Sequence, residues 1–401
     1  MRPLPARSGP WTVVACLWVV VTAANAYYIV PSGILPVVMD ELAIGPTAAS
    51  LLVSVMFGTQ VVVGVPVGIA LDRLDNRRAI AAATLVFIAA YAWTWQAAAS
   101  GAFWSLLAAR AVATPMTAAL WTASINVTGR QFPPSQQATA VGVVTSAPAA
   151  GFAIGLVTGP LVASRLGWDA VFAIYAAPVA VGCAAFWVAS HRFDLSGGTA
   201  ASPNPADFKR LLSRRAIWNV AAMAFLGFSL YAFVTSWVPT YLTDQLGVSL
   251  AYGGLFVALF PAIGIVARGG SGYVSDRFFG HRRRPVALLS FVVSVPAVAL
   301  VAGANTWLVV LVALLVSGLF VQLGLGLFYA QARELADTNV VATAVGFTTS
   351  MAVLGGFVAP IVGGFLIEQS GYPAAFGYAI GVGVVGIALA WVAPEPELSA
   401  R

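Results

Sequence analysis

The sequence predicts an all-α polytopic membrane protein with twelve transmembrane helices, arranged as two six-helix parallel pseudo-repeats. Hydrophobic residues make up 60% of the 401-residue chain and charged residues 8%, whereas soluble domains carry about 25% charged residues. Apolar runs of about 20 residues recur along the chain, and each is long enough to cross a bilayer as a helix. The phrase "ATAVG" begins at Ala138 and again at Ala342, which points to a duplicated half.

Twelve apolar runs, bounded by charges or by proline and glycine, define the predicted spans. Their limits are 12–38, 47–70, 79–98, 102–126, 137–162, 170–190, 217–241, 250–272, 285–303, 306–330, 341–366 and 373–393. The first run follows a basic N-terminus, as in a secretory signal. Its apolar character continues beyond Ala26 through "YYIVPSGILPVVM", so we expect an uncleaved first helix.

The basic residues indicate the topology. Of the 20 lysine and arginine residues, 17 fall on one side of the twelve-span model; Arg165 falls on the other, and Arg110 and Arg268 fall within spans. Because basic residues concentrate in cytoplasmic loops, we expect a multi-pass protein of the cytoplasmic (inner or plasma) membrane with both termini in the cytoplasm. The net charge of +6 then reflects membrane topology, and the expected partner is the lipid bilayer and not nucleic acid.

The longest polar segment, "HRFDLSGGTAASPNPADFKRLLSRR", separates six spans from six. We therefore expect an N-terminal six-helix bundle over 1–190, a cytoplasmic linker over 191–215 and a C-terminal six-helix bundle over 216–401. Serine, glycine and proline are typical of a flexible linker. The end of the segment, "ADFKRLLSRR", has the pattern of a short amphipathic helix on the membrane surface.

A constant offset of 204 residues relates the two halves. It maps Gly142 to Gly346, Gly151 to Gly355 and Tyr27 to Tyr231, among other pairs in five spans. Because each half has an even number of spans, both halves take the same orientation in the membrane, as in a parallel repeat. The small residues of the repeated phrase suit close packing between helices.

Two cytoplasmic segments carry a family resemblance. "GIALDRLDNRR" (68–78) and "GYVSDRFFGHRRR" (272–284) resemble the signature Gly-x-x-x-Asp-Arg-x-Gly-Arg-Arg of the major facilitator superfamily, in the loops after spans 2 and 8. The resemblance extends over nearly the whole chain. It implies the twelve-helix fold of that superfamily and a secondary transporter that works by rocker-switch alternating access, and we expect it to be a monomer.

The resemblance also implies conformational gating residues, because the signature latches the cytoplasmic helix ends together in the family. By position these are Gly68, Asp72, Arg73, Arg77, Gly272, Asp276 and Arg277. The two glycines are expected to allow close helix approach. The copies depart from the pattern: Asp75 and Phe279 stand where glycine is expected.

The phrase "GFAIGLVTGP" (151–160) partly resembles the antiporter signature of span 5. Gly155, Gly159 and Pro160 fit that signature, whereas Ala163 and Ser164 replace its final glycines. Close packing between the halves explains these glycines equally well, so the direction of transport stays open.

Arg110 and Arg268 break the repeat, because they map to Leu314 and Gly64. A charged residue inside a membrane is costly and marks a functional site by default. Arg110 lies about 12 Å along span 4, near the bilayer centre, with no carboxylate at comparable depth. A bound anion would supply its counter-ion. The alternative is an arginine held by backbone carbonyls near Pro115.

Arg268 lies about 6 Å from the inner edge of span 8, so its head group is also able to reach the lipid surface. Its surroundings, "ARGGSGYVSDR", are similar to span 8 of nitrate/nitrite porters, where an arginine binds the anion. Those porters pair it with a second arginine in span 2, where this chain has Gly64. This difference argues against nitrate.

In the family, spans 1, 4, 7 and 10 line a central cavity. The predicted substrate-binding residues are therefore Arg110, Arg268 and the polar or aromatic residues at middle depth: Asn25, Tyr27, Tyr28, Tyr231, Trp237 and Gln322. Asn25, Tyr27 and Tyr231 are preferred because they lie nearest the bilayer centre.

The predicted function is secondary transport of a small solute, with an organic or inorganic anion as the preferred class. No intramembrane carboxylate or histidine exists to relay protons, so proton symport, exchange for a counter-anion and uniport stay open. The alternatives are proton-coupled efflux of lipophilic drugs or metabolites and a non-transporting membrane sensor. No phosphate loop, nucleophile elbow or metal cluster occurs, so no enzyme activity, catalytic residue, cofactor or metal is expected.

Overall fold

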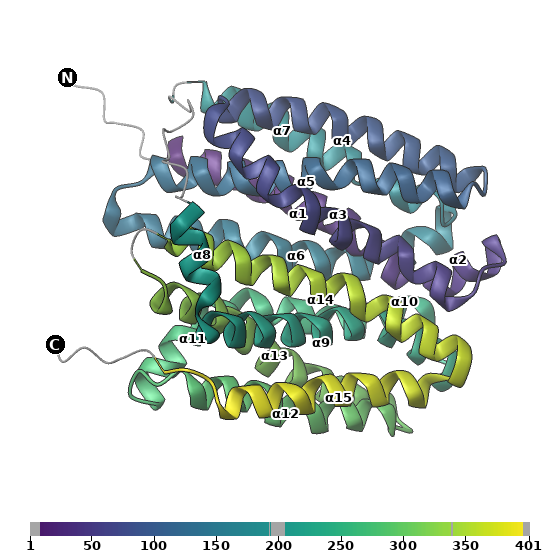
Figure 1. Cartoon of the computed structure of the whole chain (residues 1–401). Helices are drawn as coiled ribbons and strands as arrows, with labels where there is room; N and C mark the ends of the chain where they lie inside the picture. The colour runs from purple at the N-terminus through teal and green to yellow at the C-terminus, as the bar shows by residue number, and fades with distance from the viewer. Residues whose placement is uncertain (1–8, 192, 194–204, 338–339, 396–401) are drawn as a thin grey trace, which may run out of the picture. The chain divides into compact units, whose positions relative to one another are not determined.

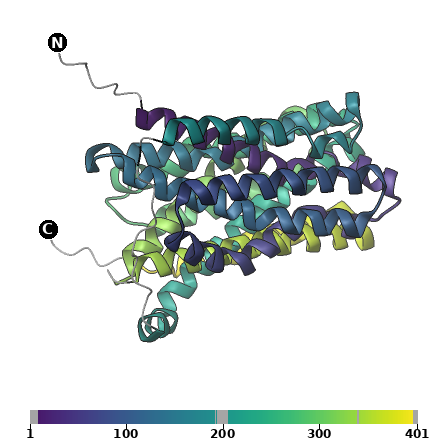
Figure 2. The same cartoon turned by 90° about the horizontal axis from the view of Figure 1, so that it is seen from above.

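The computed structural model describes residues 9–191, 193, 205–337 and 340–395. In this part of the chain the regular elements are all helical, and twelve helices are long and apolar enough to cross a membrane. The predicted fold class is confirmed, and each predicted span overlaps one of the twelve helical spans. Within each compact unit described below, the long helices run alongside one another (Figures 1 and 2).

The described residues form two compact units, one from residues 1–30 and 62–200 and one from residues 31–61 and 201–401. The first unit contains α1 (Gly9–Ile29), the second part of α3 (Pro46–Arg73), α4 (Asn76–Ala99), α5 (Phe103–Gln131), α6 (Pro134–Leu166), the short helix η2 (Ala170–Phe172) and α7 (Ala176–Ser190). Residues 31–61, which the sequence placed in the N-terminal bundle, pack with the second unit.

The second unit begins with α2 (Leu35–Leu42) and the first part of α3. It continues with α8 (Pro205–Ser213), α9 (Arg215–Leu246), α10 (Leu250–Ala262), α11 (Gly264–Phe278), α12 (Arg284–Ala302), α13 (Trp307–Leu335), α14 (Val341–Ser370) and α15 (Tyr372–Trp391). Helix α8 covers the stretch expected to form a short helix at the end of the linker.

Prolines interrupt the first and the eighth predicted spans, and the sixth is divided near its start, into η2 and α7. The first span ends as α1 at Ile29 and continues as the 3-10 helix η1 (Val30–Gly33), because Pro31 has no N–H to continue the α-helix. The eighth span divides into α10 and α11 at Ile263, two residues after Pro261. Both interruptions free backbone groups inside an apolar span, where water is absent.

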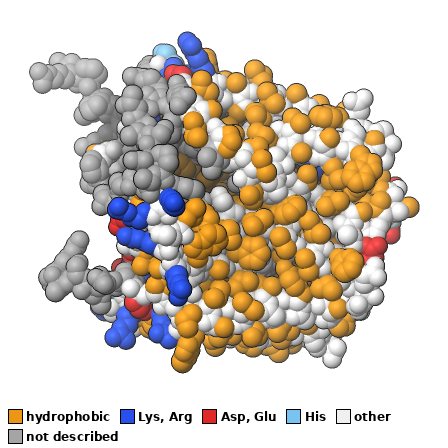
Figure 3. Space-filling view, in the orientation of Figure 1, with side chains coloured by type: hydrophobic (Ala, Val, Ile, Leu, Met, Phe, Trp, Pro, Cys, Tyr) orange, Lys and Arg blue, Asp and Glu red, His pale blue; other side chains and the backbone are white. Residues whose placement is uncertain are grey.

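Large hydrophobic side chains cover the outer surfaces of the helices, as expected for helices that face lipid. Trp104, Val266 and Val62 are each at least 74% exposed, which a water-soluble protein would rarely tolerate over a wide surface. Figure 3 shows hydrophobic side chains over most of the visible face, whereas lysine and arginine gather at helix ends.

The repeat reappears as the same helix contact in both units. In the first unit a Cβ on Gly151 of α6 would lie 2.4 Å from the Thr22 carbonyl oxygen of α1, and in the second unit Gly355 of α14 meets Phe225 of α9 in the same way. Only glycine allows this approach. The glycines of the repeated phrase behave differently, because a Cβ on Gly142 or Gly346 meets nothing within 4 Å.

Replacing Gly355 by valine should therefore destabilise the protein, because the added side chain meets the backbone of Phe225. Overpacking of this kind costs about 1–3 kcal/mol. The expected result is a lower midpoint of thermal unfolding for the purified protein in detergent. Gly346→Val on the same helix is the matched control and should leave the midpoint nearly unchanged. Equal midpoints for the two variants would contradict this packing.

Candidate functional site

Arg110 of α5 is completely buried in the first unit. Its Nη1 donates to the Tyr27 carbonyl oxygen at 3.3 Å, and its Nη2 donates to the Tyr28 carbonyl oxygen at 2.8 Å. The guanidinium lies 4.8 Å from the centre of the Tyr27 ring and 5.6 Å from that of Phe172. Carbonyl oxygens and ring faces thus surround the positive charge.

Pro31 explains why these carbonyls accept bonds from a side chain. In an uninterrupted α-helix the Tyr27 carbonyl would bond the N–H of residue 31, but proline has none. Arg110 supplies the missing donor, and its charge suits the negative end of the α1 dipole. The carbonyl-held alternative predicted for Arg110 matches these contacts, although the carbonyls belong to α1 and not to the region of Pro115.

The second unit provides an internal comparison. The offset of 204 places Thr235 opposite Pro31 and Leu314 opposite Arg110. Thr235 has the N–H that Pro31 lacks, and α9 runs unbroken from Arg215 to Leu246. Where the proline is absent, the arginine is absent too.

Arg268 of α11 has different surroundings in the second unit. Its Nε donates to the Gln322 Oε1 of α13 at 2.6 Å, and its guanidinium lies 5.6 Å from the centre of the Tyr231 ring of α9. The side chain is half-buried. Among the described residues, its Nη1 and Nη2 have no hydrogen-bond partner and no carboxylate within salt-bridge distance. The two terminal nitrogens of Arg268 therefore remain available to bind a ligand.

Gln322 holds Arg268 beside the interruption between α10 and α11. The Gln322 amide is buried, and its Nε2 donates to the Phe260 carbonyl oxygen at 3.5 Å, while its Oε1 accepts from Arg268. A Cβ on Gly264 would lie within 2.6 Å of this amide group, so only glycine leaves room for it. Gln322 thus links the end of α10 to the side chain of Arg268.

The predicted substrate-binding residues thus form two groups, one in each unit. Tyr27 and Tyr28 lie with Arg110; the Tyr27 hydroxyl is 2.8 Å from the Thr94 hydroxyl. Tyr231 and Gln322 lie with Arg268. Asn25 and Trp237 belong to neither group: the Asn25 amide donates to the Val21 carbonyl at 2.8 Å, and the Trp237 indole donates to the Pro360 carbonyl at 2.9 Å.

The second copy of the gating signature contains a network of ion pairs. Arg283 binds Glu334 through Nη2 at 2.6 Å and through Nε at 3.0 Å, and it binds Asp276 through Nη1 at 2.8 Å. The hydrogen bonds that Arg283 donates to Glu334 raise the pKa of the Arg283 guanidinium, against the effect of burial. His281 also contacts Asp276, at 3.1 Å. Arg277 is exposed, so Arg283 and not its neighbour Arg277 holds Asp276.

In the first copy, Arg77 holds the end of α7. It donates to the hydroxyl and carbonyl of Ser190 and, at 2.7 Å, to the carbonyl of Phe193. Asp75, which departs from the family pattern, caps α4 by accepting the Arg78 N–H at 2.9 Å.

The remaining gating residues are less informative. The side chains of Asp72 and Arg73 lie outside the described part of the structure. The close helix approach predicted at Gly68 and Gly272 is not present, because a Cβ on either residue meets no described atom within 4 Å. Open space at both glycines is the reason that this packing expectation fails.

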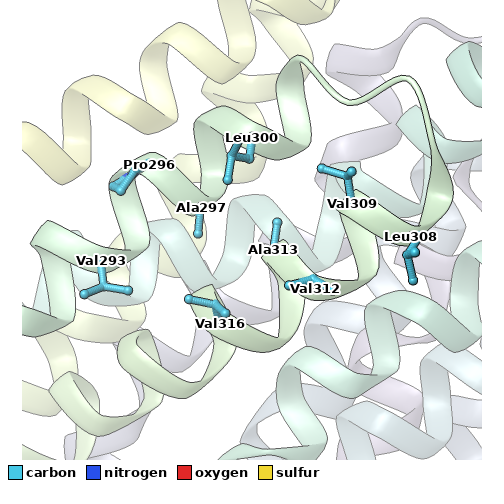
Figure 4. Close-up of a pocket in the computed structure, with 9 residues that line it drawn as sticks. All are labelled: Val293, Pro296, Ala297, Leu300, Leu308, Val309, Val312, Ala313 and Val316. Atoms are coloured by element: carbon cyan, nitrogen blue, oxygen red, sulfur yellow. The ribbon is translucent and has the colours of Figure 1, made fainter.

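A pocket of about 460 Å³ lies between α12 and α13 (Figure 4). It is lined entirely by apolar or proline side chains: Val293, Pro296, Ala297, Leu300, Leu308, Val309, Val312, Ala313 and Val316. Without a polar group to fix orientation, this pocket offers nothing to a charged solute.

The Major Facilitator Superfamily model matches residues 16–360 and 271–401, which together include all or most of every span. The chain therefore belongs to the Major Facilitator Superfamily. With transporters as its relatives, it is a membrane transporter and not an enzyme.

Individual relatives are distant. The hexuronate transporter of Bacillus subtilis is 26% identical over 84% of this chain and 83% of its own length. The glycerol-3-phosphate transporter of the same organism is 31% identical over 46% of this chain and 43% of its own. A probable nitrate/nitrite antiporter of Thermus thermophilus is 28% identical over 38% of this chain and 36% of its own.

The fold resembles that of solved transporters. The crystal structure of a bacterial homolog of the human lysosomal transporter Spinster, in an inward-facing and unoccupied conformation, superposes with a TM-score of 0.82 at 14% identity. Each chain is covered to 97%. At this identity the likeness establishes the fold alone.

Replacing Arg110 by methionine should destabilise the protein more than Arg268→Met. The Arg110 change removes the donor that replaces the missing Pro31 N–H at the buried Tyr27 carbonyl, at about 1–3 kcal/mol, and it also removes the bond to the Tyr28 carbonyl. Arg268 is half-buried and makes one side-chain hydrogen bond. The midpoint of thermal unfolding in detergent measures the difference. A smaller loss for Arg110→Met than for Arg268→Met would contradict the repair of α1 by Arg110.

Proposed function

We propose that the protein moves a small organic or inorganic anion across the cytoplasmic membrane by rocker-switch alternating access, with Arg268 as the anion-binding group. The observation that carries the proposal is the state of Arg268, which has two unused terminal nitrogens and no carboxylate beside it in the described chain. A guanidinium binds carboxylate or phosphate oxygens through paired N–H groups. The Tyr231 ring beside it limits access of water.

Arg110 takes a supporting role in this proposal. Binding an anion there would require breaking its bonds to the Tyr27 and Tyr28 carbonyls, and the Tyr27 carbonyl would again lack the donor that Pro31 cannot supply. We therefore assign Arg110 to holding the end of α1, beside Tyr27 and Tyr28, and Arg268 to the solute.

Names of relatives support an anionic solute. The hexuronate transporter, the nitrate/nitrite antiporter and a probable sulfoacetate transporter of Cupriavidus necator are all named for anions.

The bias of basic residues supports cytoplasmic termini. Proton symport, exchange for a counter-anion and uniport are the three modes to separate: an imposed pH gradient would drive the first, an anion placed on the opposite side would drive the second, and neither would drive uniport.

Efflux of a lipophilic compound is the second candidate function. The chloramphenicol resistance protein of Streptomyces lividans is 26% identical over 74% of this chain and 74% of its own length. The glycine and proline residues of "GFAIGLVTGP" also support it. Resistance to hydrophobic drugs on expression, without uptake or exchange of any anion, would favour efflux over the first proposal.

Arg268→Met should abolish anion flux in proteoliposomes containing the purified protein. The test panel is hexuronate, glycerol-3-phosphate, sulfoacetate and nitrate. Arg268→Lys should retain part of the flux, because a lysine keeps the charge but not the paired donors. Arg333→Gln, which removes an exposed positive charge from α13, is the control and should transport normally. Undiminished flux in Arg268→Met would refute the assignment.

Gln322→Glu should also stop transport while leaving the protein folded. The new carboxylate would stand about where the Gln322 Oε1 now lies, 2.6 Å from the Arg268 Nε, and would neutralise the arginine in place of the solute. Gln322→Met removes the hydrogen bond without adding a charge, so it should reduce flux less. Solute affinity, measured by titration calorimetry, should fall at least tenfold in Gln322→Glu. A glutamate variant with normal affinity would contradict the role of Arg268.

A further inference from the structure

A second pocket, of about 530 Å³, lies at one end of the second unit, away from Arg268. The turn between α11 and α12, the first turns of α12 and the end of α15 with the chain after it form its walls. The residues that matter for its chemistry are Arg282, Arg284, Leu288, Trp391 and Glu395. None of them belongs to the proposed transport site or is one of the predicted gating residues, although Arg282 and Arg284 lie in the basic run that ends the second signature segment.

The pocket has unused positive charge. Arg282 is exposed, and neither its side chain nor that of Arg284 forms an ion pair among the described residues. The Arg284 guanidinium lies 5.4 Å from the centre of the Trp391 ring, an arrangement that fixes a cation without neutralising it.

Glu395 lowers the net charge of the pocket, but its carboxylate bonds the start of α12 and forms no ion pair with Arg282 or Arg284. Its two oxygens accept the backbone N–H groups of Arg283 and Arg284 at 2.8 and 3.0 Å. A carboxylate at the positive end of a helix is a stable arrangement by itself. The contact also keeps the chain after α15 beside α12, which gives the pocket a fixed wall.

His281 and Arg283 support the opposite side. Both contact Asp276, at 3.1 and 2.8 Å, and Arg283 also binds Glu334. These ion pairs hold the turn between α11 and α12 in place. They leave Arg282 and Arg284 as the two cations able to bind a ligand.

The pocket is also apolar on one side. Pro285 and Leu288 line it from α12, and Trp391 is 64% exposed. Arg284 begins one membrane span and Trp391 ends another, so the pocket lies where the hydrocarbon meets the headgroups. Tryptophan and arginine are the side chains that suit this boundary.

We propose that this pocket binds the phosphodiester headgroup of an anionic membrane lipid. Arg282 and Arg284 bind the phosphate, and Trp391 with Leu288 contacts the upper part of the acyl chains. Basic pockets between helices at the membrane surface bind anionic headgroups in this way. Because the ligand has both a charged head and an apolar body, it differs from the solute proposed at Arg268.

The test uses the full chain purified in a neutral detergent. Phosphatidylglycerol, phosphatidylcholine with the same acyl chains, and soluble glycerol phosphate are added separately, and thermal unfolding and native mass spectrometry report binding. Phosphatidylglycerol should raise the unfolding midpoint and remain bound in the mass spectrum. Phosphatidylcholine should do so much less, since its headgroup has no net charge. Glycerol phosphate, added to the Arg268→Met variant so that the proposed solute site does not respond, should not raise the midpoint, because it lacks acyl chains.

The variant pair Arg282→Gln with Arg284→Gln should weaken phosphatidylglycerol binding about tenfold or more. The matched control removes two exposed positive charges elsewhere in the unit, by Arg215→Gln with Arg333→Gln, and should bind the lipid normally. Midpoints without added lipid check that both double variants fold. Equal stabilisation by the two lipids, equal binding by the two double variants, or stabilisation of Arg268→Met by glycerol phosphate as large as that by phosphatidylglycerol would each overturn the proposal.

Discussion

A backbone carbonyl inside a bilayer has no water to bond, so any interruption of a helix there must be repaired by another part of the protein. The first unit depends on one such repair. Pro31 leaves the Tyr27 carbonyl without its helical donor, and Arg110 reaches from α5 to bond it and the neighbouring Tyr28 carbonyl. This contact joins α5 to the end of α1, and the rings of Tyr27 and Phe172 enclose the charge.

The second unit follows the same rule at a different helix. There α9 is continuous, and the interruption lies between α10 and α11, beside Gln322. The first-half residues that correspond to Gln322 and Arg268 are Ala118 and Gly64, and α3 is not divided at the corresponding position. In each half, therefore, an arginine lies beside one interrupted span. Buried carbonyls occupy the first arginine, whereas the second keeps donors available, and this difference supports the assignment of the solute to Arg268.

Much of the fold could be predicted from the sequence, because span length and apolar composition are local properties. The amphipathic helix expected at the end of the linker also appears, as α8. The two arginines could be found because a charge in an apolar run is conspicuous. Their contacts could not, because the acceptors of Arg110 are backbone atoms that no residue type marks; only Pro31, four residues after Tyr27, hinted at them. The ion pair of Arg283 with Glu334 and the bonds of Glu395 join residues more than 50 positions apart, and a pattern read along the chain does not reveal such contacts.

The proline and arginine of the first unit also bear on the history of the chain. The duplicated half has kept both residues in one copy, and the other copy has threonine and leucine instead. An arginine buried without the freed carbonyls would be a costly charge, and a proline without the arginine would leave a carbonyl unbonded. Each change alone would have been harmful, so the two positions are expected to have changed together after the duplication. In related sequences, replacement of this proline should accompany loss of this arginine.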